Sequence, residues 1–325
     1  MNKEEFTGRL QSIIDLNEDC KSQVFFVMNR NGEKRVKKAN IQRDVLTAIS
    51  EAYRNNLAVE ISKFADDAER DVLNLSDRDD RANVIYRYDL PDDEPSFFAS
   101  MRDVVAEHPL GYFTGENMFS FDDDSLSDLD CFVTELGVDD NKIVIYRNNF
   151  NVNLMKQACG RFYLNKSGTQ FTTIDEDILR MDSQIDIMMI DDDFYVLNLS
   201  YLDGSKEFAS IIRSRAETSI VGIEGLNLVD SVDGLRERLS ELSFARRLMR
   251  AMDSSPVTDM PAQDVIRFVS QHDTLNNVLK VADGRIKLSS KKAQDYFVRL
   301  MNDDFLHSQL TSQDYTSTSK NKLVQ

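Results

Sequence analysis

Residues 185–200 read IDIMMIDDDFYVLNLS. Two apolar runs, each long enough for a strand but too short for a helix, flank three consecutive aspartates. Aspartate is favoured in turns because its carboxylate accepts hydrogen bonds from nearby backbone N–H groups. We therefore predict two strands joined by a turn at Asp191–Asp193. We expect this hairpin to end a β-meander over residues 161–199.

The sequence pattern changes on the two sides of this meander. After residue 200 the apolar residues mainly follow helical spacing, interrupted by one further hairpin at 279–288. The predicted fold class is α+β: an N-terminal mixed α/β region, the central β-meander and a mainly helical C-terminal part with one basic hairpin. We expect an acidic N-terminal domain at 1–140, a second domain at 141–310 and a polar flexible tail at 311–325.

The N-terminal region contains both helix and strand patterns. Four segments have the apolar spacing of helices, namely 3–17, 40–64, 96–107 and 125–137. We expect the last of them to end at Gly137, because glycine is favoured just beyond helix C-termini. An Asn31-Gly32 pair between an apolar and a basic run predicts a hairpin. The run KIVIYRN at 142–148 predicts a strand.

The composition indicates a globular protein of the cytoplasm. The chain has 325 residues, of which 41% are hydrophobic and 9% aromatic, enough for a packed core. Its three cysteines lie far apart and form no C-x-x-C pair, so we expect reduced thiols and no zinc site. No apolar run approaches the roughly 18 residues of a membrane-spanning helix. The N-terminus also lacks the apolar core of a signal peptide.

The negative charge is concentrated in one region. The net charge is −17, and residues 66–140 alone hold 22 Asp/Glu against five Lys/Arg. Residues 200–325 hold 17 of each and are neutral. Such asymmetry is compatible with two surfaces that have different partners, one of them a basic protein. It is equally compatible with a solvated acidic face that keeps the protein soluble.

The common catalytic motifs are missing. The sequence has no G-x-x-x-x-G-K-[ST] loop, no G-x-G-x-x-G and no G-x-S-x-G. The three histidines, His108, His272 and His307, are too scattered for H-E-x-x-H. We therefore predict no catalytic residue, no metal site and no cofactor.

A metal-dependent nuclease is the alternative that the acidic residues leave open. Such an enzyme needs clustered carboxylates to hold divalent ions. Asp177, Asp182, Asp186 and Asp191 are the candidate ligands, although no basic partner accompanies them in the sequence. No Glu-x-Lys, the pair common in nuclease sites, occurs in the chain.

The stretch LKVADGRIKLSSKK at 279–292 breaks two local rules. A two-residue Asp283-Gly284 loop would place Lys280 directly opposite Lys287, and like charges opposed across strands are destabilising. Lys291 and Lys292 then fall in the first turn of a helix, where the dipole disfavours cations. An anionic ligand such as a phosphate backbone would supply the missing counter-charge. Screening by water is the alternative explanation.

Two further segments carry clustered cations. If 232–254 is one helix, Arg236, Arg247 and Arg250 lie along one edge of its apolar stripe, and Arg246 falls inside the stripe. The N-terminal hairpin adds its own cations. The predicted DNA-binding residues are therefore Lys280, Arg285, Lys287, Lys291, Lys292, Arg236, Arg247, Arg250, Lys34, Arg35, Lys37 and Lys38. None of these segments has the aromatic interleaving of base-reading surfaces, so phosphate contacts should dominate.

Three segments resemble the KwaB family of effectors in the Kiwa anti-phage defence system. They are IDIMMIDDDFYVLNLSYLDGSKEF from Ile185, VLKVADGRIKLSSKKAQDYFVRLMND from Val278 and TSQDYTSTSKNKL from Thr311. The resemblance implies a cytoplasmic homodimer that docks on a small integral membrane partner, KwaA, at the inner membrane. It also implies binding to double-stranded phage DNA without sequence preference, and a block of phage replication and late expression.

Three functions remain open at this point. The first is a non-catalytic DNA-binding defence effector, the second is a defence nuclease, and the third is an acidic scaffold or inhibitor that binds a basic partner through residues 66–140.

Overall fold

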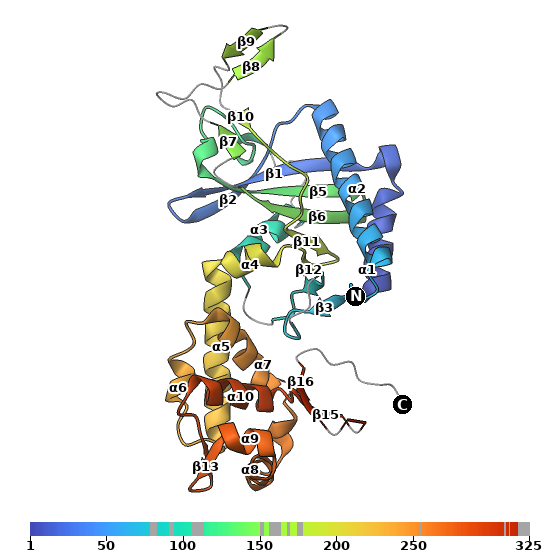
Figure 1. Ribbon diagram of the computed structural model, residues 1–325. Coiled ribbons are helices and arrows are strands. Elements are labelled where there is room, and N and C mark those ends of the chain that lie inside the picture. Colours follow the sequence, from blue (N-terminus) through green and yellow to red (C-terminus); the bar gives the residue numbers. More distant parts are fainter. Residues whose placement is uncertain are drawn as a thin grey trace. The chain divides into compact units, whose positions relative to one another are not determined.

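The computed structural model divides the chain into two compact units, which are described separately (Figure 1). Unit 1 comprises residues 1–75, 83–89 and 95–202, and unit 2 comprises 76–82, 90–94 and 203–325. The expected boundary at 140/141 falls in the turn between two paired strands, inside unit 1. The structure describes residues 1–78, 83–90, 94–105, 114–149, 153–155, 164–167, 170–173, 178–253, 255–308, 310–311 and 313–317.

Unit 1 is built on an eight-stranded sheet with the order β2-β1-β5-β6-β11-β12-β4-β3. All neighbouring strands pair antiparallel except β3 and β4, which are parallel. The strands of this sheet are β1 (Lys21–Arg30), β2 (Glu33–Lys38), β3 (Val72–Asn74), β4 (Ile85–Arg87), β5 (Leu129–Val138), β6 (Asn141–Asn148), β11 (Ile187–Ile190) and β12 (Asp193–Val196). The α+β class is thereby confirmed.

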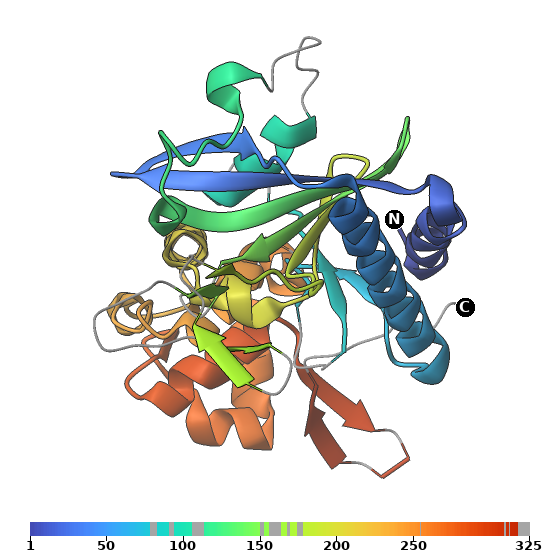
Figure 2. The ribbon, with the colours of Figure 1, turned by 90° about the horizontal axis from the view of Figure 1, so that it is seen from above.

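Helices cover both faces of the sheet. The helices of unit 1 are α1 (Lys3–Ile14), α2 (Arg43–Asp66) and α3 (Ser96–Val105), with short turns η1 (Asn17–Asp19), η2 (Gly115–Asn117) and η3 (Leu126–Asp128). Helices α1 and α2 lie side by side (Figure 2). Adjacent residues of a strand point to opposite faces. Tyr195 contacts Phe6 of α1 at 4.9 Å between ring centroids, whereas Phe194 stacks on Phe98 of α3 at 3.9 Å.

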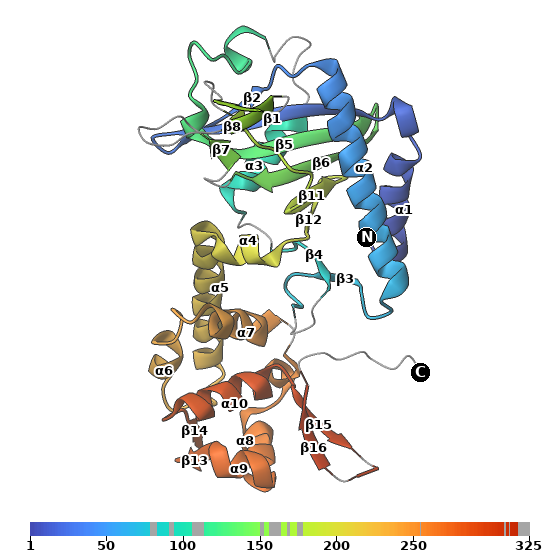
Figure 3. The ribbon, with the colours of Figure 1, turned by 45° about the horizontal axis from the view of Figure 1, so that its top comes forward.

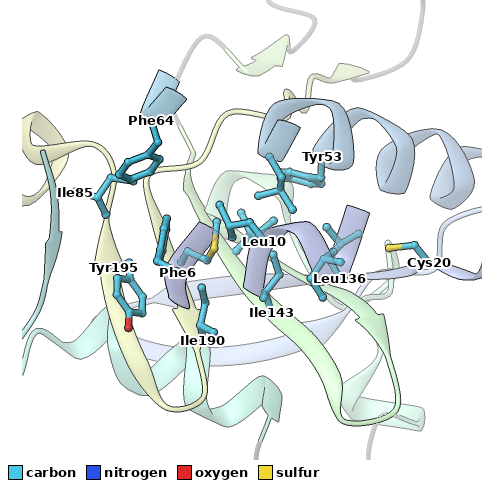
Figure 4. Packing of buried hydrophobic residues seen from close by; sticks show 14 residues of the cluster. Phe6, Leu10, Cys20, Tyr53, Phe64, Ile85, Leu136, Ile143, Ile190 and Tyr195 are labelled. Atoms are coloured by element: carbon cyan, nitrogen blue, oxygen red, sulfur yellow. The ribbon is translucent and has the colours of Figure 1, made fainter. Parts of the chain in front are cut away.

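The main core lies between α1, α2 and the sheet (Figure 4). Phe6 and Leu10 of α1 and Leu57 of α2 are completely buried against Leu136 and Ile190 of the strands. Burial of one such side chain contributes about 1.5–3 kcal/mol. This apolar contact therefore fixes α1 and α2 on the sheet.

The predicted helix at 125–137 is wrong, because this segment forms η3 and the central strand β5. Leu136 packs against the α1 and α2 core, while Cys131 and Val133 point to the other face and are also buried. A strand that is buried on both faces loses the alternation of polar and apolar residues, and its pattern then resembles helical spacing. Gly137 has φ +129°, and a Cβ there would lie 2.1 Å from the Asn141 oxygen, so the β5–β6 turn requires glycine.

The predicted turn at Asp191–Asp193 joins β11 and β12, with Asp191 and Asp192 at positive φ. The continuous meander over 161–199 does not form in the described residues. Strands β7 (Leu154–Met155) and β10 (Ile178–Leu179) pair with each other, as do β8 (Leu164–Ser167) and β9 (Gln170–Thr173). The sequences of β8 and β9, LNKS and QFTT, are too polar for the buried sheet that IMMI joins.

Unit 2 is mainly helical. Helix α4 (Leu199–Gly204) spans the boundary between residues 202 and 203. The elements that follow in unit 2 are α5 (Lys206–Gly225), α6 (Asp233–Arg236), α7 (Leu242–Asp253), η5 (Pro256–Asp259), α8 (Ala262–Gln271), α9 (Asp273–Val278), β13 (Lys280–Ala282), β14 (Arg285–Lys287), α10 (Lys291–Met301), β15 (Phe305–Ser308) and β16 (Gln313–Thr316). The prediction of one helix at 232–254 is wrong. Between α6 and α7 the backbone N–H groups of Arg238, Leu239 and Glu241 bond three residues back, which ends the helical repeat.

Residues 313–316, which lie in the predicted tail at 311–325, form β16 and pair with β15. The Asp314 carboxylate contacts two histidines, His307 Nδ1 at 2.9 Å and His272 Nε2 at 3.4 Å. Since His272 lies between α8 and α9, these contacts join the hairpin to the helical unit. No helix in the described part of the chain has the length and apolar character needed to span a membrane.

Candidate nucleic-acid interface

The hairpin β13–β14 has the predicted register. Lys280 pairs with Lys287, Val281 with Ile286 and Ala282 with Arg285. Asp283 (φ 54°) and Gly284 (φ 72°) form the two-residue turn, with the left-handed conformations that a type I′ turn requires. The lysine pair is therefore imposed by the backbone.

Buried contacts hold this hairpin in place. The side chain of Ile286 is fully buried on one face of the hairpin. Its N–H donates to the Leu228 carbonyl at 2.8 Å, and its own carbonyl accepts from the Asp230 N–H at 3.1 Å. Because both neighbours of Ile286 along β14, Arg285 and Lys287, alternate to the opposite face, they are exposed. The exposed cations thus lie on a backbone that is hydrogen-bonded to the rest of unit 2. Figure 3 shows the hairpin β13–β14 beside α9 and α10.

The cations of the hairpin have no carboxylate partner in the described part of the chain. Among the described residues, no carboxylate lies within ion-pair distance of Lys280, Arg285 or Lys287. Lys280 Nζ donates to the uncharged carbonyl of Asn276 at 3.0 Å. Two lysines are therefore direct cross-strand partners, and no carboxylate among the described residues neutralises either of them.

The start of α10 extends this charge. Ser290 caps the helix by accepting from the Ala293 N–H at 3.2 Å. Lys292 Nζ lies 5.7 Å from the ring centroid of Tyr296. Lys291, in contrast, pairs with Glu241 at 2.7 Å. We name Lys280, Arg285, Lys287 and Lys292 the basic hairpin surface.

The three arginines predicted to form an edge are already paired. Arg236 contacts Glu217 at 2.8 Å and Glu224 at 3.3 Å. Arg247 lies 3.2 Å from Asp295, and Arg250 lies 3.5 Å from the buried Asp304. The prediction that these arginines share one edge assumed a single helix at 232–254. Because α6 and α7 are separate helices, that alignment is lost.

Arg246, which the helical spacing placed inside the apolar stripe, forms an ion pair within unit 2. Its guanidinium donates to the Asp203 carboxylate at 2.6 Å, and Arg78 binds the same group at 2.9 Å. Burial favours the neutral acid, but these hydrogen bonds hold the pKa of Asp203 below its usual range.

The N-terminal hairpin β1–β2 is neutralised by the acidic segment that follows η2. Lys37 binds Asp124 at 2.6 Å, and Lys34 lies 3.2 Å from Asp130. Lys38 donates to the Gln23 side chain at 2.5 Å. Arg35 contacts Glu33 on its own strand at 3.3 Å. Part of the acidity of residues 66–140 thus balances β2 within unit 1.

The twelve predicted residues therefore fall into three groups, according to whether the side chain contacts a carboxylate, an amide or neither. Seven contact a carboxylate, namely Lys34, Arg35, Lys37, Arg236, Arg247, Arg250 and Lys291. Lys38 bonds to an amide, and the four residues of the basic hairpin surface have no ion pair with a described residue. The sequence did not reveal the counter-ions, because Lys37 and Asp124 are 87 positions apart.

The described carboxylates of the nuclease hypothesis, Asp182, Asp186 and Asp191, are paired with arginines. Arg147 of β6 binds Asp182 at 2.9 Å and the buried Asp186 at 3.1 Å. Burial opposes ionisation of Asp182, but the Arg147 guanidinium and the Gln184 N–H keep its pKa below the usual range. Asp191 instead contacts Arg9 at 3.4 Å. Asp177 lies outside the described residues, and no three potential metal ligands converge among those described.

Comparison with known proteins confirms the family resemblance that the sequence indicated. Residues 126–311 match the family described as "Kiwa protein KwaB-like". The "Kiwa protein KwaB" of Escherichia coli O55:H7 (strain RM12579 / EPEC) is 27% identical over 274 residues, which cover 80% of this chain and 84% of that protein. No solved structure matches the chain with significance. The chain therefore belongs to the KwaB-like family of the Kiwa anti-phage defence system.

Proposed function

We propose that this protein is an anti-phage defence effector that binds double-stranded DNA through its backbone phosphates, without sequence preference. Family membership supports the defence role. The observation that carries the DNA-binding part is the pair Lys280–Lys287, which has no carboxylate partner among the described residues and is fixed by its register on a hairpin anchored by the buried Ile286. A phosphate between two ammonium groups removes their repulsion and releases the counter-ions of the DNA.

The ligand class follows from what this surface offers. Ammonium and guanidinium groups bind phosphate oxygens, and an exposed short hairpin can approach the phosphates of one groove edge. Residues 279–292 contain no aromatic side chain on which an unpaired base could stack. Duplex DNA, whose bases are already stacked, is therefore the better ligand. On this proposal bound protein blocks phage replication and late expression by occupying the template.

The remaining parts of the proposal come from the family. In this proposal the protein acts in the cytoplasm as a homodimer, next to the inner membrane, where it docks on the small membrane protein KwaA. The exposed acids of residues 66–140 that do not pair within unit 1 would face the partner rather than the DNA, since like charges repel.

Charge reversal tests the site. The variant Lys280→Glu/Lys287→Glu/Lys292→Glu should lose detectable binding to a random-sequence duplex, measured by fluorescence anisotropy. The control Arg43→Glu/Lys63→Glu/Arg267→Glu has the same net charge change at exposed positions outside the surface, and it should bind within about threefold of wild type at moderate salt. Equal loss in both variants, or unchanged binding in the first, contradicts this site.

A further inference from the structure

We propose that Glu241 is a built-in competitor of DNA phosphate, which holds Lys291 away from the ligand and thereby limits affinity at the basic hairpin surface. This inference rests on the proposed function and adds a regulatory residue to it. Lys291 directly precedes Lys292 and lies in the same first turn of α10. It differs from the cations of the surface only in having a carboxylate partner.

The Glu241 carboxylate is shared between two cations of different mobility. Its Oε2 accepts from Arg238 Nη2 at 2.8 Å and from Arg238 Nε at 3.1 Å. Its Oε1 accepts from Lys291 Nζ at 2.7 Å. Hydrogen bonds from Arg238 and then Lys291 lower the pKa of Glu241 to about 2, so the carboxylate is charged at neutral pH.

Arg238 fixes this carboxylate. Its side chain is only 9% exposed, and its guanidinium carbon lies 3.9 Å from the ring centroid of Phe244. Its Nη1 also donates to the Lys291 carbonyl and to the Gln294 side chain, both at 3.3 Å. Glu241 is thereby held at a defined place beside the start of α10, and it keeps a cation when Lys291 leaves.

Lys291 is free to leave. Its side chain is 74% exposed, and exposed ion pairs add little stability. The N-terminal turn of a helix disfavours a cation, so Lys291 gains nothing from the dipole there. A phosphate that approaches Lys292 can therefore recruit Lys291, provided that it displaces Glu241. In the wild type the fixed Glu241 carboxylate retains Lys291, so the duplex binds without this phosphate contact and with lower affinity.

The variant Glu241→Gln tests the competition. Glutamine keeps an oxygen acceptor for Arg238 but loses the charge that holds Lys291. One additional phosphate contact should tighten duplex binding roughly fivefold to tenfold at 0.1 M salt and steepen the slope of log K against log salt by about 0.9. Glu237→Gln is the matched control, because Glu237 is exposed and its side chain makes no hydrogen bond or ion pair with a described residue. It should change the slope by less than about 0.3.

Two lysine variants separate competition from a general charge effect. Lys291→Gln alone should weaken binding less than about twofold, since Lys291 is occupied in the wild type. Glu241→Gln/Lys291→Gln should show the slope of Lys291→Gln. A large loss in Lys291→Gln, or equal gains in Glu241→Gln and Glu237→Gln, overturns the inference while the Lys280 and Lys287 result stands. If charge reversal of the basic hairpin surface leaves duplex binding unchanged, the result contradicts the proposed DNA-binding function itself and not only the role of Glu241.

Discussion

Two basic hairpins, β1–β2 and β13–β14, have opposite electrostatic environments. Both turn through a two-residue loop that ends in glycine, Asn31-Gly32 or Asp283-Gly284, and both carry a basic return strand. On β2, Lys34 and Lys37 reach Asp130 and Asp124 of the segment before and at the start of β5. On β13–β14, Lys280 and Lys287 face each other without a described carboxylate at either.

This difference shows that a cluster of cations has no functional meaning until its counter-charge is known. The pair Lys37–Asp124 is a structural element, with side chains only 14% and 12% exposed. The pair Lys280–Lys287 is locally unfavourable and is exposed to any ligand. The first hairpin should therefore affect stability when it is changed, and the second should affect binding.

The largest effect is expected from neutralising the second hairpin. Lys280→Gln/Lys287→Gln removes two phosphate contacts, which should weaken duplex binding about 60-fold at 0.1 M salt. The same change on the first hairpin, Lys34→Gln/Lys37→Gln, should alter binding by less than about twofold, because those ammonium groups are already neutralised. Titrations of both variants with one fluorescent duplex compare them directly. Similar losses of affinity in the two variants would show that the two hairpins do not differ in their contribution to DNA binding.

Substitutions on the first hairpin should reduce the stability of the fold more than substitutions on the second, the reverse of their order in DNA binding. Lys37→Ala leaves the half-enclosed Asp124 without its cation and should lower the free energy of unfolding by about 2 kcal/mol. Lys287→Ala removes a like-charge contact and should change it by less than about 0.5 kcal/mol, in either direction. Urea denaturation followed by circular dichroism measures both values. Greater destabilisation by Lys287→Ala would mean that Lys287 has a structural role.

The comparison can also be sharpened by converting one hairpin into the other. Asp124→Asn/Asp130→Asn removes the counter-charge of β2, while asparagine still offers an acceptor to the Ser120 N–H that Asp124 binds at 3.0 Å. Lys34 and Lys37 then become unneutralised, and duplex affinity should rise roughly fivefold at low salt. An unchanged affinity in a folded variant would show that charge without the geometry of β13–β14 is insufficient.

The smallest effect is expected from pH. The hydrogen bonds from Arg238 and Lys291 hold the pKa of Glu241 at about 2, below its ordinary value of 4.5. The stabilising contribution of this carboxylate is therefore complete above about pH 4.5 and is lost as the pH falls toward 2. Between about pH 5 and 8 the Glu241–Lys291 contact should persist, so duplex affinity should change less than about twofold. A steep rise in affinity on acidification from pH 8 to 5 would contradict this assignment.

Local sequence patterns predicted most of the elements. The turns at Asp191–Asp193 and Asp283-Gly284 and the helices α1, α2 and α3 were predictable because each depends on neighbouring residues. The strand β5 was not, because burial on both faces removes the alternation that identifies a strand. The break between α6 and α7 was also missed, since the apolar spacing continues across it.

The candidate site was predictable only in part. The register of β13–β14 follows from its turn, so the Lys280–Lys287 pair could be deduced from the sequence. The partners of the other cations could not, because Lys291 and Glu241 are 50 positions apart and meet only through the packing of unit 2. Arg147, the partner of Asp182 and Asp186, was missed for the same reason.

A salt titration of duplex binding tests the central claim most directly. If the four cations of the basic hairpin surface each contact a phosphate, the slope of log K against log salt should be about −3.6 for wild type and about −1.8 for Lys280→Gln/Lys287→Gln. A wild-type slope near zero, or the same slope in both proteins, would show that this hairpin does not bind the DNA backbone.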